Sequence, residues 1–207
     1  MRIDFVSDVV CPWCAVGLWG LQEAIRRTGI DVELHMQPFE LNPDMPPGGE
    51  DVAEHLGMKY GRSLLELAKT HEMIGARGAA VGFTFDWQKR DRIYNTFDAH
   101  RLIYWAAIEG RDVALARAMM RAYHSEGKDI SDHTVLVSIA GEINFDEHGA
   151  RAVLASDAYG DIVRQTEQQW TELEVAGVPT VIIDGKHVLS GAQPSPVYEA
   201  ALRQLKG

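Results

Sequence analysis

The sequence predicts an α/β protein in which a strand–helix–strand unit opens the chain and a β-hairpin with a final helix closes it. Three observations support this fold class. Residues 2–39 show the strand period, then the helix period, then the strand period again. Residues 52–175 carry helical patterns almost throughout, and β-branched runs return only after residue 177. With 207 residues, the chain is long enough for one domain, or for one domain with a large insertion.

The opening unit is predicted from two apolar periods. Alternation of apolar and polar residues over 2–8 predicts a strand that runs into a loop. Residues 15–27 place apolar side chains three and four positions apart, which predicts an amphipathic helix, and Gly29 is placed to end it. Alternation over 31–39 then predicts a second strand. Cys11-Pro12-Trp13-Cys14 therefore falls at the turn between the first strand and the helix.

The middle of the chain is expected to be helical. Residues 42–49 contain three prolines and two glycines, which indicates a loop that leaves the opening unit. Strand signals are nearly absent after this loop. The helical period predicts helices near residues 52–60, 63–74, 94–109, 112–125, 134–143, 146–155 and 158–175.

The end of the chain returns to strands. The β-branched run over 180–184 predicts a short strand, Asp184-Gly185 a hairpin turn, and residues 187–190 its partner strand. A final helix is expected over 195–205, because Pro196 suits a first helical turn.

Composition limits the classes of partner. Hydrophobic residues make up 46% of the chain and charged residues 24%, which is typical of a folded globular protein. The formal net charge of -10 makes attraction to nucleic acid or to anionic lipid unfavourable. No apolar run approaches the ~18 residues of a membrane span, and acidic residues stand where a signal peptide would be apolar. We therefore expect a cytoplasmic protein without nucleic-acid or membrane partners.

The two cysteines, three positions apart, are the strongest chemical signal. Structural disulfides are rare in a reducing cytosol, so the pair is expected to be catalytic or redox-sensing. The N–H groups of a helix's first turn stabilise a thiolate, which makes Cys11 the expected nucleophile, facing solvent. Cys14 follows one helical turn later as the resolving cysteine, and is expected to be covered. Pro12 suits the first helical position, and uncharged Trp13 should offer an apolar surface near the sulfur.

The cysteine pair has two other interpretations, a structural zinc site and two inert buried cysteines. A C-x-x-C pair is half of a structural zinc site, but that site needs two further ligands, and neither a second such pair nor a closely spaced histidine pair follows. Free cysteines are also often inert and buried. The sequence predicts no metal, and no cofactor other than a redox-active Cys11–Cys14 disulfide.

Four stretches of the chain resemble a known family. They are F-V-S-D-V-V-C-P-W-C at 5–14, N-T-F-D-A-H-R-L at 95–102, G-V-P-T at 177–180 and V-L-S-G-A-Q at 188–193. Together they resemble the DsbA family of thioredoxin-like proteins, and more specifically its cytosolic FrnE-like subfamily. The resemblance covers essentially the whole chain.

This resemblance implies an α/β thioredoxin-like fold with a large all-helical insertion, in a single DsbA-like domain spanning residues 1–207. The thioredoxin-like core would come from 1–41 and 176–207, and the insertion from 42–175. The family pattern also implies that Pro179 is a cis-proline facing the cysteine pair. A proline directly before a central strand agrees with this, because it cannot donate to the strand ladder.

The expected substrate-binding residues come from two of these stretches. A cis Pro179 would leave the backbone of Val178 exposed beside Cys11, ready to pair with an extended substrate, and Thr180 belongs to the same motif. His100 is also expected to bind substrate, together with Asp98 if both lie over the active site. The alternative is that His100 and Asp98 cap and pair within helices.

The leading functional hypothesis is a protein disulfide oxidoreductase that passes through a mixed disulfide on Cys11. Its substrate would be a protein or small-molecule disulfide or dithiol, with glutathione or another small thiol as a co-substrate. One alternative is a glutathione-dependent isomerase or transferase of the same fold, although relatives of that kind have a serine at the position of Cys11. Another is a redox-regulated chaperone. The direction of electron flow, the electron donor and the oligomeric state stay open.

Overall fold

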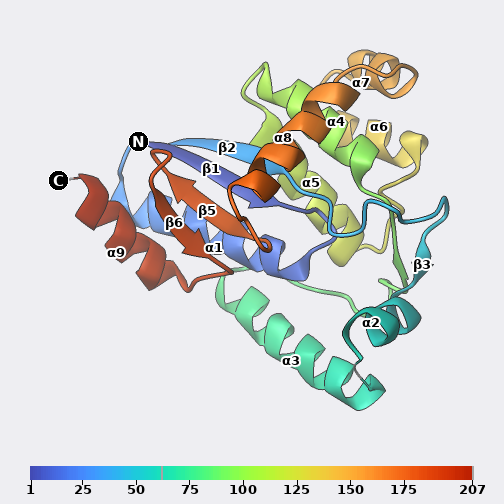
Figure 1. Ribbon diagram of the computed structural model, residues 1–207, viewed down its shortest axis with the longest axis horizontal. Coiled ribbons are helices and arrows are strands. Elements are labelled where there is room, and N and C mark those ends of the chain that lie inside the picture. The colour runs from blue at the N-terminus through green and yellow to red at the C-terminus, as the bar shows by residue number, and fades with distance from the viewer. Residues whose placement is uncertain (62, 207) are drawn as a thin grey trace.

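Four strands form one mixed sheet in the order β2-β1-β5-β6 (Figure 1). The computed structural model describes residues 1–61 and 63–206, so positions 62 and 207 of the expected domain lie outside it. Strand β1 is parallel to β2 and antiparallel to β5, and β5 is antiparallel to β6. The strands are β1 (Arg2–Ser7), β2 (Glu33–Pro38), β5 (Thr180–Ile183) and β6 (His187–Ser190). All four lie within two residues of the ranges that the sequence predicted.

The central strands are buried because helices cover the sheet. Helix α1 (Pro12–Thr28) connects β1 to β2 and packs beside the final helix, α9 (Ser195–Lys206). Gly29 ends α1 in the left-handed conformation with φ 64°, as the sequence predicted. At the β2 edge, the N–H of Met36 donates to Asp112 Oδ2 at 2.8 Å, which satisfies a backbone group that an edge strand would otherwise expose.

The segment between β2 and β5 is largely helical, as expected. Helices α4, α5 and α8 pack against β2, whereas α2 and α3 lie below the sheet, with α3 against α1 (Figure 1). Its helices are α2 (Val52–Tyr60), α3 (Leu64–Ala80), α4 (Phe97–Ala107), α5 (Asp112–His124), α6 (His133–Glu142), α7 (Glu147–Leu154) and α8 (Gly160–Glu172). Their ends lie within three residues of the predicted ends, except that α3 continues six residues past the predicted end at 74.

Helix α3 extends through Gly75 and Gly78, and another segment packs closely on the second of these glycines. A Cβ atom at Gly78 would lie 2.6 Å from Cε2 of Phe85, so the missing side chain makes room for this ring. Glycine is a poor helix former, and the sequence alone therefore favoured an earlier end.

The insertion is not helical throughout, which corrects one detail of the expectation. Two short strands, β3 (Glu50–Asp51) and β4 (Arg92–Ile93), pair in antiparallel fashion. The side chain of Arg92 donates to the carbonyl oxygens of Gly48 and Gly49, at 2.8 and 2.7 Å, and so holds the loop before β3 against β4. Strands of two residues are too short to show an alternating pattern.

Within the described residues, no helix is long and apolar enough to cross a bilayer.

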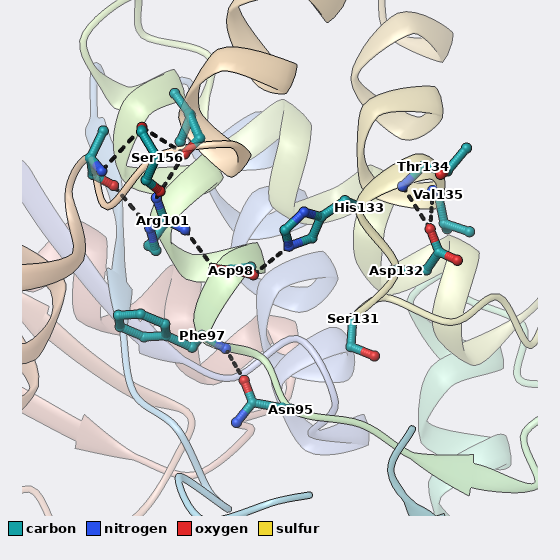
Figure 2. A network of polar contacts seen from close by, with 12 residues as sticks. Asn95, Phe97, Asp98, Arg101, Ser131, Asp132, His133, Thr134, Val135 and Ser156 are labelled. Atoms are coloured by element: carbon teal, nitrogen blue, oxygen red, sulfur yellow. Dashed lines mark hydrogen bonds and ion pairs between the residues drawn. The ribbon is translucent and has the colours of Figure 1, made fainter. Parts of the chain in front are cut away.

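A buried arginine of α4 holds the end of α7 and the turn that follows it, and Asp98 links it to α6 (Figure 2). Arg101 of α4 is 4% exposed and donates to the carbonyl oxygens of Val153, Ser156 and Ala158, between α7 and α8. It also donates to Asp98 Oδ1 at 2.7 Å, and Asp98 Oδ2 contacts His133 Nε2 of α6 at 2.7 Å (Figure 2). These contacts satisfy the carbonyl groups at the end of α7.

Replacing Arg101 with methionine should destabilise the protein strongly. The change leaves three carbonyl groups without their charged donor, and we expect the free energy of unfolding to fall by roughly 3 kcal/mol or more. Urea unfolding measures this. The matched control is His133→Gln, at the exposed end of the same network, which should cost less than about 1 kcal/mol. Equal losses in the two variants would contradict the central position of Arg101.

Candidate active site

Helix α1 begins at the cysteine pair. Cys11 is the N-cap residue, with the extended conformation φ −80° and ψ 114°, and Pro12 occupies the first helical turn. The N–H of Cys14 donates to the carbonyl oxygen of Cys11 at 3.0 Å. Both side chains are free thiols. The strand-to-helix turn thus places the two sulfurs together at the N-terminus of α1, as the sequence predicted.

Cys11 is more buried than expected. Its exposure is 5%, against 0% for Cys14, so the expectation that Cys11 faces open solvent is wrong. The reason is that the insertion covers this end of α1: Cys11, Pro12 and Trp13 line a cavity whose opposite wall comes from α2, α3 and residues 90–93. A partner reaches Cys11 through a cavity of about 290 Å³.

The two thiols differ in acidity. The pKa of Cys11 is lowered, first because the Cys14 thiol donates a hydrogen bond to its sulfur, and further by the N–H groups of Cys14 and Trp13, although burial acts in the opposite direction. The pKa of Cys14 is raised well above that of an ordinary thiol by burial and by the neighbouring Cys11. Cys11 is therefore the thiol that ionises first, which is the property a nucleophile needs.

The turn before β5 lies against the cysteine pair. The Val178–Pro179 peptide bond is cis, as the family pattern implied. The Cys11 thiol is 3.8 Å from the carbonyl oxygen of Val178. On the other side, a Cβ atom added at Gly17 of α1 would lie 3.0 Å from Cγ of Pro179, so the proline ring packs on this glycine. Residues 167 positions apart in the chain thus meet at one sulfur.

Thr180 and His100 do not lie where substrate-binding residues are expected. Thr180 is 3% exposed, and its hydroxyl donates to the carbonyl oxygen of Gly177 at 2.8 Å, so it stabilises the turn. His100 is also 3% exposed and is not part of the cavity wall; its Nε2 lies 3.5 Å from Oδ1 of Asp8. Asp98 points away on the same helix, toward Arg101 and His133 (Figure 2).

Sequence reasoning missed Asp8, three residues before Cys11. Its side chain is fully buried and accepts the N–H of Leu41 at 2.8 Å. Burial opposes a charge on His100, but contact with Asp8 outweighs it and raises the pKa of the imidazole. The negative charge of Asp8 also raises the pKa of both thiols. An acidic residue at the end of an apolar strand was the available signal.

Glu40 extends this charged cluster behind the cysteine pair. Burial, together with the like charge of Glu167, raises its pKa to about 7, although Arg164 contacts its carboxylate and acts the other way. Burial outweighs the ion pair, because Arg164 is shared with Glu167 and is half-exposed, whereas Glu40 is 8% exposed.

No metal site is apparent. Among the residues that the structure describes, no group of three or more histidine, cysteine and acidic side chains could hold a metal ion.

Comparison with known proteins gives one family. The model for the DSBA-like thioredoxin domain matches residues 2–203. The chain is 27% identical over 205 residues to the uncharacterized protein YwbO of Bacillus subtilis, covering 98% of this chain and 96% of YwbO. It is 36% identical to the crystal structure of a probable DsbA oxidoreductase from Streptomyces coelicolor, with a TM-score of 0.91 and coverage of 100% and 90%. It shares the fold of the cytosolic disulfide reductase DsbM from Pseudomonas aeruginosa with GSH, at 23% identity, a TM-score of 0.69 and full coverage of both chains.

The Cys14 thiol should control the acidity of Cys11. Replacing Cys14 with alanine removes the hydrogen bond to the Cys11 sulfur and should raise the pKa of Cys11. Replacing it with serine keeps a donor and should raise that pKa less. The pH dependence of iodoacetamide alkylation of Cys11 measures both variants. If alanine and serine shift the pKa equally, the thiol hydrogen bond is not the cause.

Glu40 should make stability depend on pH. Folded Glu40 holds its proton up to about pH 7, whereas its unfolded value is near 4.5. The folded state therefore binds more protons between these values, and the free energy of unfolding should fall as pH rises through this range. Glu40→Gln removes this contribution, so it should gain up to about 3 kcal/mol over the wild type between pH 4.5 and 8. Urea unfolding at several pH values tests it. Glu172→Gln, at an exposed carboxylate of α8, is the control and should show no such gain.

Proposed function

The chain belongs to the DSBA-like thioredoxin domain family and is a DsbA-like thiol–disulfide oxidoreductase, and we propose that it reacts through a mixed disulfide on Cys11. The observation that carries this proposal is the pairing of an acidified Cys11 thiol with a protonated Cys14 at the start of α1, at the wall of one cavity. Exchange needs one thiol that ionises readily and a second held in reserve.

The two cysteines reduce a disulfide in two successive displacement steps. The Cys11 thiolate attacks one sulfur of a substrate disulfide, forms the mixed disulfide and releases the first substrate thiolate, which takes a proton from water. Cys14 then loses its proton and attacks the sulfur of Cys11. The Cys11–Cys14 disulfide forms, the second substrate thiolate leaves, and two electrons have passed from the protein to the substrate.

A small thiol fits the site as the co-substrate. The cavity beside Cys11 is closed on one side by α2 and α3, and its volume of about 290 Å³ suits a small molecule or one extended segment of a chain. The DsbM structure contains GSH, which supports a small thiol as the co-substrate here. We therefore propose a cytoplasmic enzyme of the FrnE-like kind that uses glutathione or another small thiol. An extended substrate would pair with the Val178 backbone, beside Cys11.

In this proposal the chain consists of a core that holds the reactive groups and an insertion that shapes the cavity. We propose that residues 1–41 and 176–207 form the thioredoxin-like core that holds the cysteines and Pro179. Residues 42–175 form the insertion that shapes the cavity. A glutathione-dependent isomerase would have no evident use for Cys14, and a redox-regulated chaperone would bind polypeptide without catalysing exchange on Cys11.

Replacement of each cysteine by serine should separate these functions. Cys11→Ser should abolish reduction of a disulfide substrate by a small thiol. Cys14→Ser should still attack but fail to resolve, so a mixed disulfide on Cys11 should accumulate and be identified by mass spectrometry. Partial activity in Cys11→Ser would favour an isomerase, and polypeptide binding by a wild type that catalyses no exchange would favour a chaperone.

A further inference from the structure

The cavity beside Cys11 contains a buried guanidinium without a carboxylate partner. Arg90 is 6% exposed and belongs to the cavity wall. In the described part of the chain it forms no ion pair, and its Nε has no hydrogen-bond partner. A guanidinium stays charged and carries five N–H donors, and buried charges are ordinarily paired. Arg90 is therefore an incompletely satisfied cation at the wall of the reactive cavity.

Aromatic rings hold Arg90 in place and do not replace an anion. Its guanidinium lies 5.3 Å from the ring centroid of Trp87 and 5.3 Å from that of Tyr123. The Tyr123 hydroxyl also accepts a hydrogen bond from the Arg90 side chain. Ring faces attract a cation, but they provide no acceptor in the plane of the guanidinium for the Nε–H. The rings therefore fix the position of Arg90 while Nε is still without an acceptor.

The cavity wall holds three other basic side chains, and none of them is an unpaired cation. His71 stacks on Trp87, and burial together with Arg90 lowers the pKa of its imidazole, which favours the neutral form. His55 lies between Glu50 Oε2, at 2.6 Å, and Asn42 Oδ1, at 3.0 Å. Lys59 donates to the carbonyl oxygen of Leu41 and to Asn42 Oδ1. No aspartate or glutamate belongs to the described wall. Arg90 is thus the cation of this wall that keeps an N–H, at Nε, without an acceptor among the described residues.

The positive charge of Arg90 at this site is opposite to the net negative charge of the whole chain. A protein of net charge -10 repels an anionic substrate at long range, so an anion enters such a cavity only where a local cation holds it. A carboxylate matches a guanidinium, because two parallel N–H···O bonds form between the two planar groups.

We propose that Arg90 binds a carboxylate of the substrate, so that Cys11 acts on small thiols or disulfides that carry a carboxylate. This inference rests on the proposed exchange reaction and names its substrate class. Arg90 selects the substrate, whereas the electron transfer stays with the two cysteines.

The test compares two disulfides that differ in charge. The reduced protein is mixed with the dianion of 3,3′-dithiodipropionic acid or with the neutral diamide of the same compound, and the second-order rate of Cys11–Cys14 oxidation is measured. The wild type should prefer the dianion. Arg90→Gln should lose roughly tenfold or more of its rate with the dianion, as expected for a lost charged hydrogen bond, and change little with the diamide.

Two further variants and one competition complete the design. Arg90→Lys keeps the charge without the planar fork, and should retain part of the preference. Lys89→Gln makes the same change of net charge at an exposed neighbour that is paired with Asp86, and should keep the full preference. In the wild type, succinate should slow oxidation by the dianion, whereas succinamide should not, a result that needs no folded variant.

The outcomes separate the two proposals. Equal rates with both disulfides in the wild type, or an equal loss with both in Arg90→Gln, overturn the role of Arg90 and leave the exchange reaction standing. Failure of both disulfides to oxidise the cysteine pair overturns the exchange reaction, and the inference about Arg90 with it.

Discussion

The pairing of β1 with β5 is the constraint on which the site depends. In this antiparallel pair Phe5 lies opposite Val181, and Val6 opposite Thr180, so the end of β1 and the start of β5 meet at one end of the sheet. Cys11 follows β1 and Pro179 precedes β5, and this register is what brings the thiol within reach of the Val178 carbonyl oxygen. The insertion packs next to α1 and so forms the opposite wall of the cavity.

Local contacts, rather than the overall charge, set the acidity of the thiols. The chain is acidic, Asp8 is buried nearby, and burial itself disfavours a thiolate, so three effects oppose ionisation of Cys11. The Cys14 thiol and the first N–H groups of α1 outweigh them because they point at the sulfur from short range. Burial and the neighbouring Cys11 keep Cys14 protonated, although a hydrogen bond from the Asp8 backbone acts the other way. One helical turn therefore produces two thiols with different reactivity.

The sequence predicted the local elements well and the long-range placement of side chains less well. Strand alternation, helical periods, Gly29 and the cysteine spacing each depend on a few neighbouring residues, and the structure confirms them. The burial of Cys11 depends on α2 and α3, which are remote in sequence, and so was not predicted. His100 was misplaced because its motif does not show which face of α4 turns toward Asp8. Arg90 could not be predicted as a binding residue, because the sequence does not show that its buried Nε lacks a hydrogen-bond partner.

The ionisation order of the two thiols tests the account most directly. In reduced protein labelled with ¹³C at the cysteine Cβ atoms, NMR titration follows Cys11 and Cys14 separately. The account predicts that Cys11 ionises below the ordinary thiol pKa of about 8.5 and that Cys14 stays protonated well above it. If Cys14 ionises first, or if both thiols titrate together near the ordinary value, the assignment of Cys11 as the nucleophile is contradicted.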